Sequence, residues 1–362
     1  MKKWIQILLA AALTLSCLSG CGAQNGNQTP PAESGQTPSA SEGETHVVED
    51  ALGRSVELPV SDVTAVVSNA YNMELVNAIG AIDQVVGVDW YIWQDAESWK
   101  GRFTEDMEVG KDPEMNYEKI IELDPDVLIL AENGGWEDAE AALTPFGIQV
   151  FVSNAYYTSE FLNTALKLGE VLGHQEEAQV LYSYFKEKLD YIDRQLEDVP
   201  EKTVYFEYRT PGRTSIPGDY FYNMVAYAHG DNIFKDATAN QVDLEAVVEA
   251  DPDYIVKVSA PDVTSSYYPP TPEEHQAIRD ELISRPGWDE ISAVKNDHIL
   301  LLSHYVHGGA SKLVGCMYVA KFLYPEQLPD LHPEQVFSDW LTMFQHNDYI
   351  AGHTDPAFTF DD

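Results

Sequence analysis

Basic side chains are scarce in this chain, so their positions are informative. Its 362 residues include 21 Lys and Arg against 60 Asp and Glu, which gives a formal net charge of −39. Arg209, Arg213 and Lys257 each follow an expected β-strand in the C-terminal half. A guanidinium binds carboxylate or hydroxamate oxygens through its planar fork of N–H donors. These three cations therefore predict contacts with an anionic ligand, and ion pairs with the abundant acidic residues are the alternative for each.

Aromatic residues follow the expected strands of the N-terminal half. The candidates for ligand contact are Tyr71, Trp90, Tyr91, Trp93 and Trp136. Large rings with a polar edge supply flat apolar surface, which suits a metal chelate or a macrocycle. Packing in the hydrophobic core is the alternative for any one of them, because aromatic side chains also dominate cores.

A loop in the C-terminal half places two histidines around a tyrosine. His304 and His307 are three residues apart and flank Tyr305. Histidine ligates metals, and Tyr or His can ligate haem iron. A zinc or haem site would need further ligands at defined spacing, and the sequence has none. We therefore expect polar loop histidines, no metal site and no cofactor, and we keep Tyr305 as a candidate for ligand contact.

Motifs that indicate catalysis are missing from the sequence. It has no Gly-x-Ser-x-Gly elbow, no phosphate-binding loop and no His-Glu-x-x-His helix. The strongly negative charge argues against nucleic acid or an anionic membrane surface as a partner. We expect a binding protein that is not an enzyme, and an α/β lipoprotein enzyme, such as a hydrolase or a chelatase-like protein, is the alternative class.

Two similar segments flank the middle of the chain. Residues 116–129 and 243–256 align without a gap, and in each a glutamate, Glu118 or Glu245, precedes a Pro-Asp pair by seven positions. Each segment is typical of a short helix, a turn and a buried strand. The repeat predicts two related α/β lobes.

The segment between the two copies has the pattern of one long amphipathic helix. In residues 175–198 apolar side chains recur every three or four positions. Gly173 can end the preceding helix in a left-handed conformation, and Pro200 cannot continue this one. The helix would span roughly 35 Å. The predicted N-terminal lobe, linking helix and C-terminal lobe are residues 46–173, 174–199 and 200–362.

Strands alternate with helices in both predicted lobes, which favours largely parallel sheets. A hairpin at residues 47–59 opens the first lobe. The expected strands are residues 63–67, 85–88, 127–130, 149–152, 203–206, 254–256 and 299–302. Ligands of such sheets bind outside the carboxyl ends of the strands. The predicted fold class is α/β, with two Rossmann-like lobes joined by one long rigid helix and a ligand cleft between the lobes.

The first 21 residues have the order of a lipoprotein signal peptide. Two lysines precede a short apolar run, and residues 18–21 (Leu-Ser-Gly-Cys) resemble the lipobox of bacterial lipoproteins, in which the cysteine carries the lipid. An ordinary signal peptide is the alternative. Residues 22–45 are polar, so we expect a flexible tether. These features predict an extracytoplasmic protein that contacts the membrane only through lipid on Cys21, with Cys316 unpaired.

Several motifs recur together in one known family. They are residues 50–54 (Asp-Ala-Leu-Gly-Arg), the two Glu-x6-Pro-Asp elements, residues 285–288 (Arg-Pro-Gly-Trp), residues 293–295 (Ala-Val-Lys) and residues 320–326 (Ala-Lys-Phe-Leu-Tyr-Pro-Glu). In these motifs and their order, the chain from about residue 47 to residue 344 resembles the substrate-binding lipoproteins of ABC importers for ferric siderophores, haem and cobalamin. The resemblance implies two α/β lobes that move little, because a helix hinges poorly.

The same resemblance implies partners and roles. Glu118 and Glu245 match positions where family members present one carboxylate on each lobe to arginines of a dimeric permease with its ATPase. Favourable interaction with the helix dipole is the alternative for both residues. The resemblance also implies a monomer that captures an iron–siderophore chelate, with haem or a corrinoid as the alternative ligand.

Overall fold

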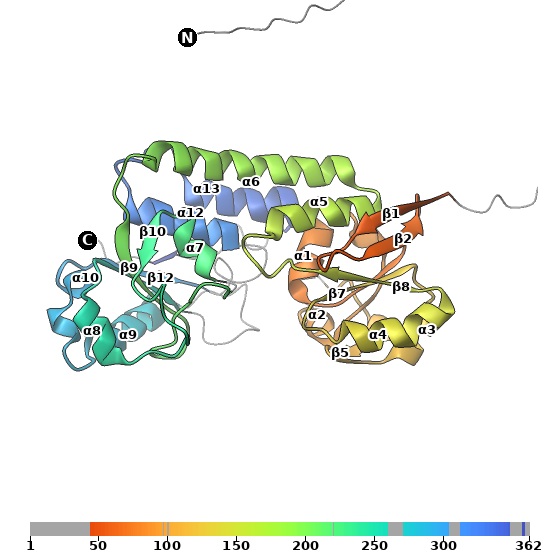
Figure 1. Ribbon diagram of the computed structural model, residues 1–362, viewed down its shortest axis with the longest axis horizontal. Coiled ribbons are helices and arrows are strands. Elements are labelled where there is room, and N and C mark those ends of the chain that lie inside the picture. The colour runs from red at the N-terminus through yellow and green to blue at the C-terminus, as the bar shows by residue number, and fades with distance from the viewer. Residues whose placement is uncertain are drawn as a thin grey trace, which may run out of the picture. The chain divides into compact units, whose positions relative to one another are not determined.

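Two largely parallel sheets, one in each half of the chain, organise the fold (Figure 1). The computed structural model describes residues 44–96, 98–99, 101–219, 221–259, 271–303, 312–347 and 357–358. The predictions for Cys21, His304, Tyr305 and His307, and for residues 1–43, lie outside the described residues. Residues 43–362 form one compact unit.

The N-terminal sheet has the order β4-β3-β7-β8, and its strand pairs are all parallel, as predicted. Its strands are β3 (Ala65–Val67), β4 (Val85–Val88), β7 (Val127–Ala131) and β8 (Gln149–Ser153). The hairpin β1 (Thr45–Glu49) and β2 (Ser55–Pro59) precedes it, and β5 (Gly110–Lys111) pairs with β6 (Glu114–Met115). The helices of this lobe are α1 (Ala70–Ala78), α2 (Trp90–Gln94), α3 (Tyr117–Leu123) and α4 (Trp136–Leu143), with short turns η1 (Ile82–Gln84), η2 (Glu105–Met107) and η3 (Thr144–Phe146).

The C-terminal sheet has the order β10-β9-β11-β12-β13. Its parallel strands are β9 (Lys202–Glu207), β10 (Gly230–Asn232), β11 (Tyr254–Val258) and β12 (Ile299–Leu302), and β13 (Ala357–Phe358) joins the edge antiparallel. The helices here are α7 (Tyr222–Ala226), α8 (Leu244–Ala250), α9 (Pro272–Ile283), α10 (Ser292–Lys295), α12 (Lys312–Leu323) and α13 (Pro333–Asp339), with η4 (Trp288–Glu290) and the π-helical turn η6 (Trp340–Phe344).

The predicted repeat is visible in both lobes as the same local structure. Helices α3 and α8 each have seven residues, and each ends at an aspartate with left-handed backbone, Asp124 or Asp251. In the first lobe Asp126 accepts from the Thr64 hydroxyl at 2.8 Å and its N–H donates back to that oxygen at 3.2 Å. Asp253 and Thr203 make the same reciprocal pair at 2.8 and 3.0 Å. Each aspartate thus ties the start of its strand to the neighbouring strand.

The long linking helix is α6 (Gln175–Leu196), close to the predicted limits of 174 and 199. Gly173 ends α5 (Phe161–Leu172) with a φ of 77°, the left-handed conformation that its sequence position predicts. Gly169 allows α5 and α6 to approach closely, because a Cβ at that position would lie 2.5 Å from the Ala178 Cβ. On the apolar face of α6, Phe185 and Ile192 are fully buried.

Alternate residues of each strand contribute to different cores, because successive side chains point to opposite faces of a sheet. In β9, Tyr205 belongs to a core covered by α8 and α9, whereas Val204 and Phe206 face the helices around α6. The N-terminal sheet is divided in the same way, with Val66 on its outer face. The inner faces of both sheets belong to one continuous core that includes α6. The two lobes are therefore packed on a common apolar interior.

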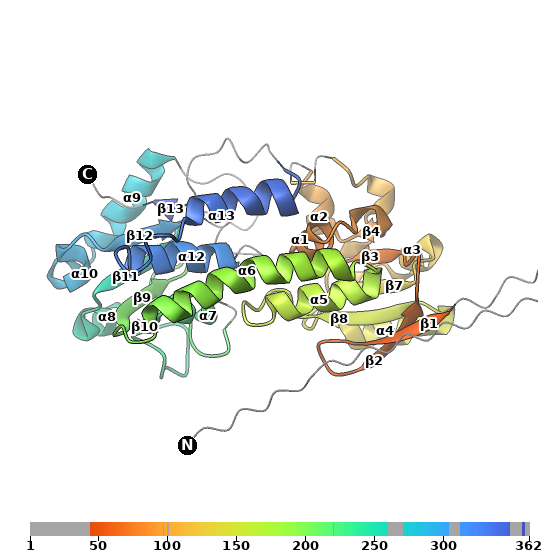
Figure 2. The ribbon, with the colours of Figure 1, turned by 90° about the horizontal axis from the view of Figure 1, so that it is seen from above.

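The C-terminal segment differs from the predicted division of the chain, which assigned it to the C-terminal lobe alone. Helices α13 and η6 lie beside α6 in both views (Figures 1 and 2). Trp340 contacts Phe161 and Phe185, with ring centroids 6.2 and 6.0 Å apart. The Gln345 side chain donates to the Glu74 carbonyl at 2.9 Å, inside the N-terminal lobe. The lobes are thus joined by α6 and by this returning segment, which the single-helix prediction missed.

Truncation of Trp340 tests whether the lobes share one core. Trp340→Ala removes a fully buried ring and should lower the free energy of unfolding by about 3–5 kcal/mol. Urea denaturation followed by circular dichroism and fluorescence should still show one transition. Met343→Ala, in the same helical turn but 52% exposed, is the control and should change stability by less than about 0.5 kcal/mol. Early separate unfolding of the C-terminal half would contradict a common core.

Candidate functional site

Buried carboxylates organise the loops at the carboxyl ends of β3 and β4. Asp89 accepts from the Asn69 N–H at 2.6 Å and from the Ile92 N–H at 2.9 Å, which fixes the starts of α1 and α2. The Ser68 hydroxyl lies 2.9 Å from Asp112 and 3.3 Å from Asp89. Burial raises the pKa of Asp89, and the neighbouring charge of Asp112 raises it further. Polar contacts with side chains of the N-terminal lobe therefore fix the conformation of these loops.

The segment after β4 forms the short helix α2, and this turns its aromatic side chains in different directions. Trp90 is half-buried and Tyr91 is 49% exposed, and their rings meet edge-to-face at 5.3 Å. Trp93 packs against the common core. Lys111 places its ammonium 3.8 Å from the Trp90 ring centroid. The exposed ring surface is therefore formed by Trp90 and Tyr91, and the Lys111 ammonium contacts it. Sequence reasoning missed Lys111, because no sequence pattern indicated it.

Trp136 does not lie with that ring surface. It is the first residue of α4 and packs against the outer core of the N-terminal sheet. The Arg54 guanidinium covers its ring at 4.4 Å from the centroid, and Arg54 also forms an ion pair with Asp50 at 2.6 Å. This arrangement corresponds to core packing, the alternative for each aromatic residue, so it does not support the prediction of ligand contact for Trp136.

Side chains from both lobes meet around Lys312, at the start of α12. Its ammonium lies 4.9 Å from the Tyr71 ring centroid in the N-terminal lobe and 5.0 Å from the Phe221 centroid in the C-terminal lobe. It also donates to the Tyr156 carbonyl. Burial lowers the pKa of Lys312 to about 7, against the opposing charges of Glu74 and Asp219. Sequence reasoning missed this residue, although a lysine at the start of a mostly apolar helix was a readable signal.

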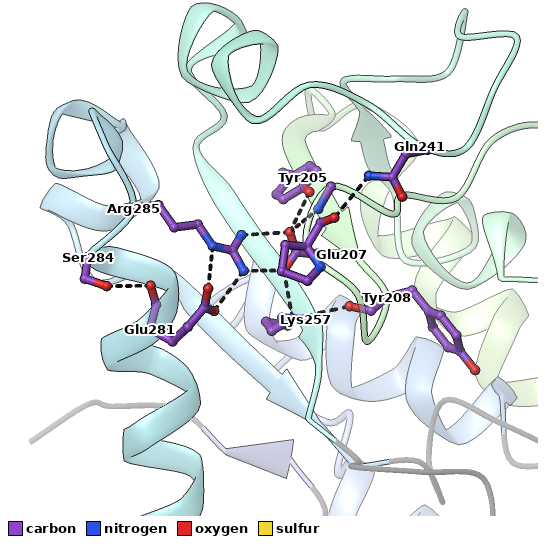
Figure 3. Close-up of polar contacts among 10 residues, drawn as sticks. Tyr205, Glu207, Tyr208, Gln241, Lys257, Glu281, Ser284 and Arg285 are labelled. Carbon is purple, nitrogen blue, oxygen red and sulfur yellow. Dashed lines mark hydrogen bonds and ion pairs between the residues drawn. The ribbon is translucent and has the colours of Figure 1, made fainter.

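Glu207, at the end of β9, binds two basic side chains of the C-terminal lobe (Figure 3). Its carboxylate accepts from Lys257 at 2.7 Å and from both terminal nitrogens of Arg285 at 2.8 and 2.9 Å. The Tyr205 hydroxyl donates to it at 2.8 Å and the Gly212 N–H at 2.9 Å. Burial alone would raise the pKa of Glu207, but Arg285 and Lys257 outweigh it and lower that pKa. The carboxylate is therefore charged and fully satisfied.

This cluster changes the interpretation of Lys257. Its side chain is 6% exposed, and the ammonium also contacts the Tyr208 carbonyl. A cation held by a buried carboxylate does not reach a ligand in this arrangement, so the prediction of ligand contact for Lys257 is not supported. Arg285, from the Arg-Pro-Gly-Trp motif, has a structural role here that the motif alone did not indicate.

The Glu207 cluster positions the loop that carries Arg209 and Arg213. Besides the Gly212 N–H bond to Glu207, Gln241 donates to the Pro211 carbonyl at 3.1 Å, and the Val242 N–H donates to the Gly212 carbonyl at 2.8 Å. Arg209 donates to the Tyr208 hydroxyl at 2.7 Å, and the Tyr208 ring stacks on Phe221 at 5.1 Å. Arg213 is exposed. The Arg209 guanidinium thus lies beside the aromatic residues around Lys312, and Arg213 is an exposed residue of the same loop.

The remaining predicted residues in the described ranges are two glutamates and one cysteine. Glu118 and Glu245 are both exposed, and each is the second residue of its helix, α3 or α8. Cys316 is buried and unpaired. Within the described ranges, no group of three or more His, Cys, Asp or Glu side chains could hold a metal ion. No helix in those ranges is long and apolar enough to cross a membrane.

Comparison with known proteins identifies the family. The model of a family described as periplasmic binding protein matches residues 65–305. This chain belongs to the periplasmic binding protein family. The Bacillus subtilis protein YvrC, an uncharacterized ABC transporter substrate-binding lipoprotein, is 28% identical over 343 residues, covering 90% of this chain and 99% of YvrC. The petrobactin-binding protein YclQ of Bacillus subtilis is 22% identical over 327 residues, covering 85% and 94%.

A solved structure supports the same assignment at the level of the fold. The crystal structure of the TroA-like periplasmic binding protein FepB from Veillonella parvula matches with a TM-score of 0.72 at 22% identity, covering 87% of this chain and 99% of that one. As a member of the family, this chain is the substrate-binding protein of an ABC importer, which works with a permease and an ATPase and catalyses no reaction itself.

The loop that carries Arg209 and Arg213 is called the arginine loop below. Substitution of Gly212 tests whether this loop has a rigid conformation. Gly212 has a φ of 73°, and a Cβ there would lie 2.6 Å from the Val242 carbonyl oxygen. Gly212→Ala should destabilise the protein by clearly more than the roughly 1–2 kcal/mol that left-handed backbone alone costs a residue with a side chain. Gly147→Ala is the control, because Gly147 has a φ of 86° and nothing within 4 Å. Equal losses in urea denaturation would contradict the close packing of the loop.

Proposed function

We propose that this protein captures a metal chelate of the iron–siderophore type between its lobes and delivers it to the permease. The observation that carries the proposal is the convergence of Tyr71 and Phe221, one from each lobe, on Lys312, with the arginine loop alongside. Ring surface and guanidinium groups together suit a chelate with apolar faces and anionic oxygens. The similarity to a petrobactin-binding protein supports this ligand class. The protein itself would need no cofactor.

Haem or a corrinoid is the alternative ligand. The rings of Tyr71, Trp90 and Tyr91 offer flat surface that suits a macrocycle as well as a chelate. A macrocycle without anionic groups would depend on this ring surface and little on the arginines. The two ligand classes therefore predict different responses to loss of positive charge.

Removal of the arginines distinguishes these ligands. Arg209→Ala should weaken binding of an anionic ferric catecholate about thirtyfold or more, because loss of one partner of a desolvated charge pair costs roughly 2–5 kcal/mol. Arg213→Ala should have a smaller effect that fades with added salt, since Arg213 is exposed. Tryptophan quenching measures the affinity, and Arg194→Ala, an exposed site on α6, is the control. Unchanged affinity in both variants, with strong quenching by a neutral corrinoid, would reject the siderophore in favour of the alternative.

We also propose that Glu118 and Glu245 dock the protein on the permease. They occupy equivalent positions in the repeat, one on each lobe, and a two-fold receptor needs a ligand surface with matching pseudo-symmetry. Opposite charges would steer and orient the encounter more than they add affinity. The common core supports this role, because it keeps the lobes, and therefore the two carboxylates, in a fixed relation.

The double variant Glu118→Ala, Glu245→Ala should keep its ligand affinity and lose uptake through the cognate permease. Uptake of a radiolabelled iron chelate into cells measures this effect. Glu122 and Glu249 are also exposed, lie one turn further along α3 and α8, and form an equivalent pair, so their double alanine variant is the control. Wild-type uptake by the Glu118/Glu245 variant would remove the docking role, and loss of ligand binding would place these residues in the ligand site.

The remaining part of the proposal is an extracytoplasmic, lipid-anchored monomer. The lipobox-like sequence before Cys21 and the polar tether at residues 22–45 support it, as does the lipoprotein description of YvrC. Cys21→Ser should release a soluble protein that still binds ligand, which cell fractionation and immunoblotting would detect. A Cys21→Ser protein that stays in the membrane fraction after removal of its signal peptide would contradict the anchor.

A further inference from the structure

Tyr208 connects the buried charges of the C-terminal lobe with its aromatic residues. Its backbone is fixed by two hydrogen bonds, because the Lys257 ammonium donates to its carbonyl at 3.3 Å and its own N–H donates to the Arg213 carbonyl at 2.7 Å. In Figure 3 the carbonyl of Tyr208 faces Lys257, and the phenol ring extends away from the Glu207 cluster. The backbone contacts therefore set the direction in which this ring leaves the loop.

The ring of Tyr208 is also fixed, by stacking. It lies 5.1 Å, centroid to centroid, from the ring of Phe221, with 29° between the two planes. Phe221 is 4% exposed, contacts Phe206 of β9 at 6.1 Å, and has the Lys312 ammonium 5.0 Å from its centroid. A tyrosine side chain has only two rotatable torsions, and stacking on a buried ring restricts both. The position of the Tyr208 hydroxyl is therefore well defined.

This hydroxyl binds the guanidinium of Arg209. The Nη1 atom of Arg209 donates to the Tyr208 hydroxyl at 2.7 Å, and the central guanidinium carbon lies 4.9 Å from the centroid of the same ring. An arginine side chain has high rotamer entropy, and a ligand that immobilises a flexible arginine loses affinity to that ordering. A guanidinium that the protein already holds loses less when a ligand binds.

Arg213 shows that a fixed backbone alone does not place a guanidinium. Its N–H donates to the Thr210 carbonyl at 3.0 Å, and its carbonyl accepts from the Tyr208 N–H. Its side chain is nevertheless exposed, and among the residues that the structure describes it forms no ion pair or hydrogen bond. The two arginines of the loop thus differ in their side-chain surroundings, and the Tyr208 hydroxyl is part of that difference.

We propose that Tyr208 is a positioning residue for ligand recognition, whose hydroxyl holds the Arg209 guanidinium in the orientation that binds an anionic group of the ligand. The inference rests on the proposed function, in which Arg209 contacts an anionic chelate. It identifies a side chain that makes this contact selective for negative charge. The net charge of −39 repels anionic chelates in general, so their capture depends on the few cations that the protein holds in place.

Removal of the hydroxyl alone tests this role, because Tyr208→Phe keeps the stacked ring. The variant should bind an anionic ferric catecholate about threefold to tenfold more weakly, the range expected for ordering one flexible side chain. Its affinity for the uncharged N-acetyl derivative of ferrioxamine B should not change. In an Arg209→Ala background, Tyr208→Phe should have no further effect on either affinity, which makes the two changes a double-mutant cycle. Tryptophan quenching measures each affinity.

Tyr184→Phe is the matched control for loss of a hydroxyl. The Tyr184 hydroxyl donates to Asp339 at 2.8 Å, beside α6 and away from the arginine loop, so this variant should keep both affinities. Equal weakening of the charged and the uncharged ligand by Tyr208→Phe would indicate general disturbance of the site and would overturn the positioning role. An unreduced effect of Tyr208→Phe in the Arg209→Ala background would overturn it as well.

The order of the guanidinium in the protein without ligand separates failure of this inference from failure of the proposed function. NMR relaxation of ¹⁵N-labelled arginine side chains reports the order parameter of the Arg209 Nε–Hε group, and Arg209→Ala assigns its signal. Tyr208→Phe should lower this order parameter and leave that of Arg213 unchanged. An unchanged order parameter overturns the positioning role, whatever the affinities. If the order parameter falls while Arg209→Ala binds the catecholate as tightly as wild type, Tyr208 holds Arg209 as inferred, and the ligand contact of Arg209 in the proposed function is contradicted.

Discussion

The buried carboxylate of Glu207 is the interaction on which the binding face of the C-terminal lobe depends. It holds Lys257, Arg285, the Tyr205 hydroxyl and the Gly212 N–H together in a space that is almost closed to water. Buried ion pairs of this kind add little net stability compared with apolar packing of the same volume, because desolvation offsets the attraction. They do specify one geometry, since every donor must reach the same two oxygens. The geometry specified here is that of the arginine loop.

The hydrophobic core shared by both lobes restricts how far the lobes can move. The inner faces of both sheets pack on the helices around α6, and Trp340 and Gln345 return to the N-terminal lobe. Large closure of the lobes around a ligand would disrupt these contacts. Recognition by this protein therefore depends on groups that are already in place, such as Lys312 between Tyr71 and Phe221. The same rigidity keeps Glu118 and Glu245 in a fixed relation for a symmetric receptor.

Sequence patterns predicted the fold well where they had a physical period or a repeat. The alternation of apolar strands and helices, the Pro-Asp turns and Gly173 led to two parallel sheets and the linking helix at nearly correct limits. The packing of the C-terminal segment against the N-terminal lobe was not predictable. An apolar helix pattern shows that one face is buried but does not show which element covers that face. The reciprocal Thr64–Asp126 and Thr203–Asp253 pairs were also invisible, since each joins residues 50 or more positions apart.

The structure does not bring all the predicted site residues together, and the reason is common to them. Position after a strand indicates the correct edge of a sheet but not the direction of a side chain. Trp136, after β7, turns to the outer core, and Lys257, inside β11, turns to Glu207. Lys312 belongs to none of the motifs, and its contacts with Tyr71 and Tyr156 join residues far apart in sequence, so only the folded chain places it between the lobes. Ligand contact by Arg209 and Arg213 stays a prediction. The fixed conformation of the loop that carries them supports it.

The most direct test of the central claim is to identify what copurifies with the protein. The full chain would be isolated gently from its native cells, and native mass spectrometry and the visible absorption spectrum would be recorded together. We predict one small metal chelate bound in about equimolar amount, with the absorption of a ferric complex and unchanged composition after prolonged incubation. A protein that carries no small molecule, fails to bind any added ferric chelate or macrocycle, and turns over ester or phosphoester substrates would contradict the account.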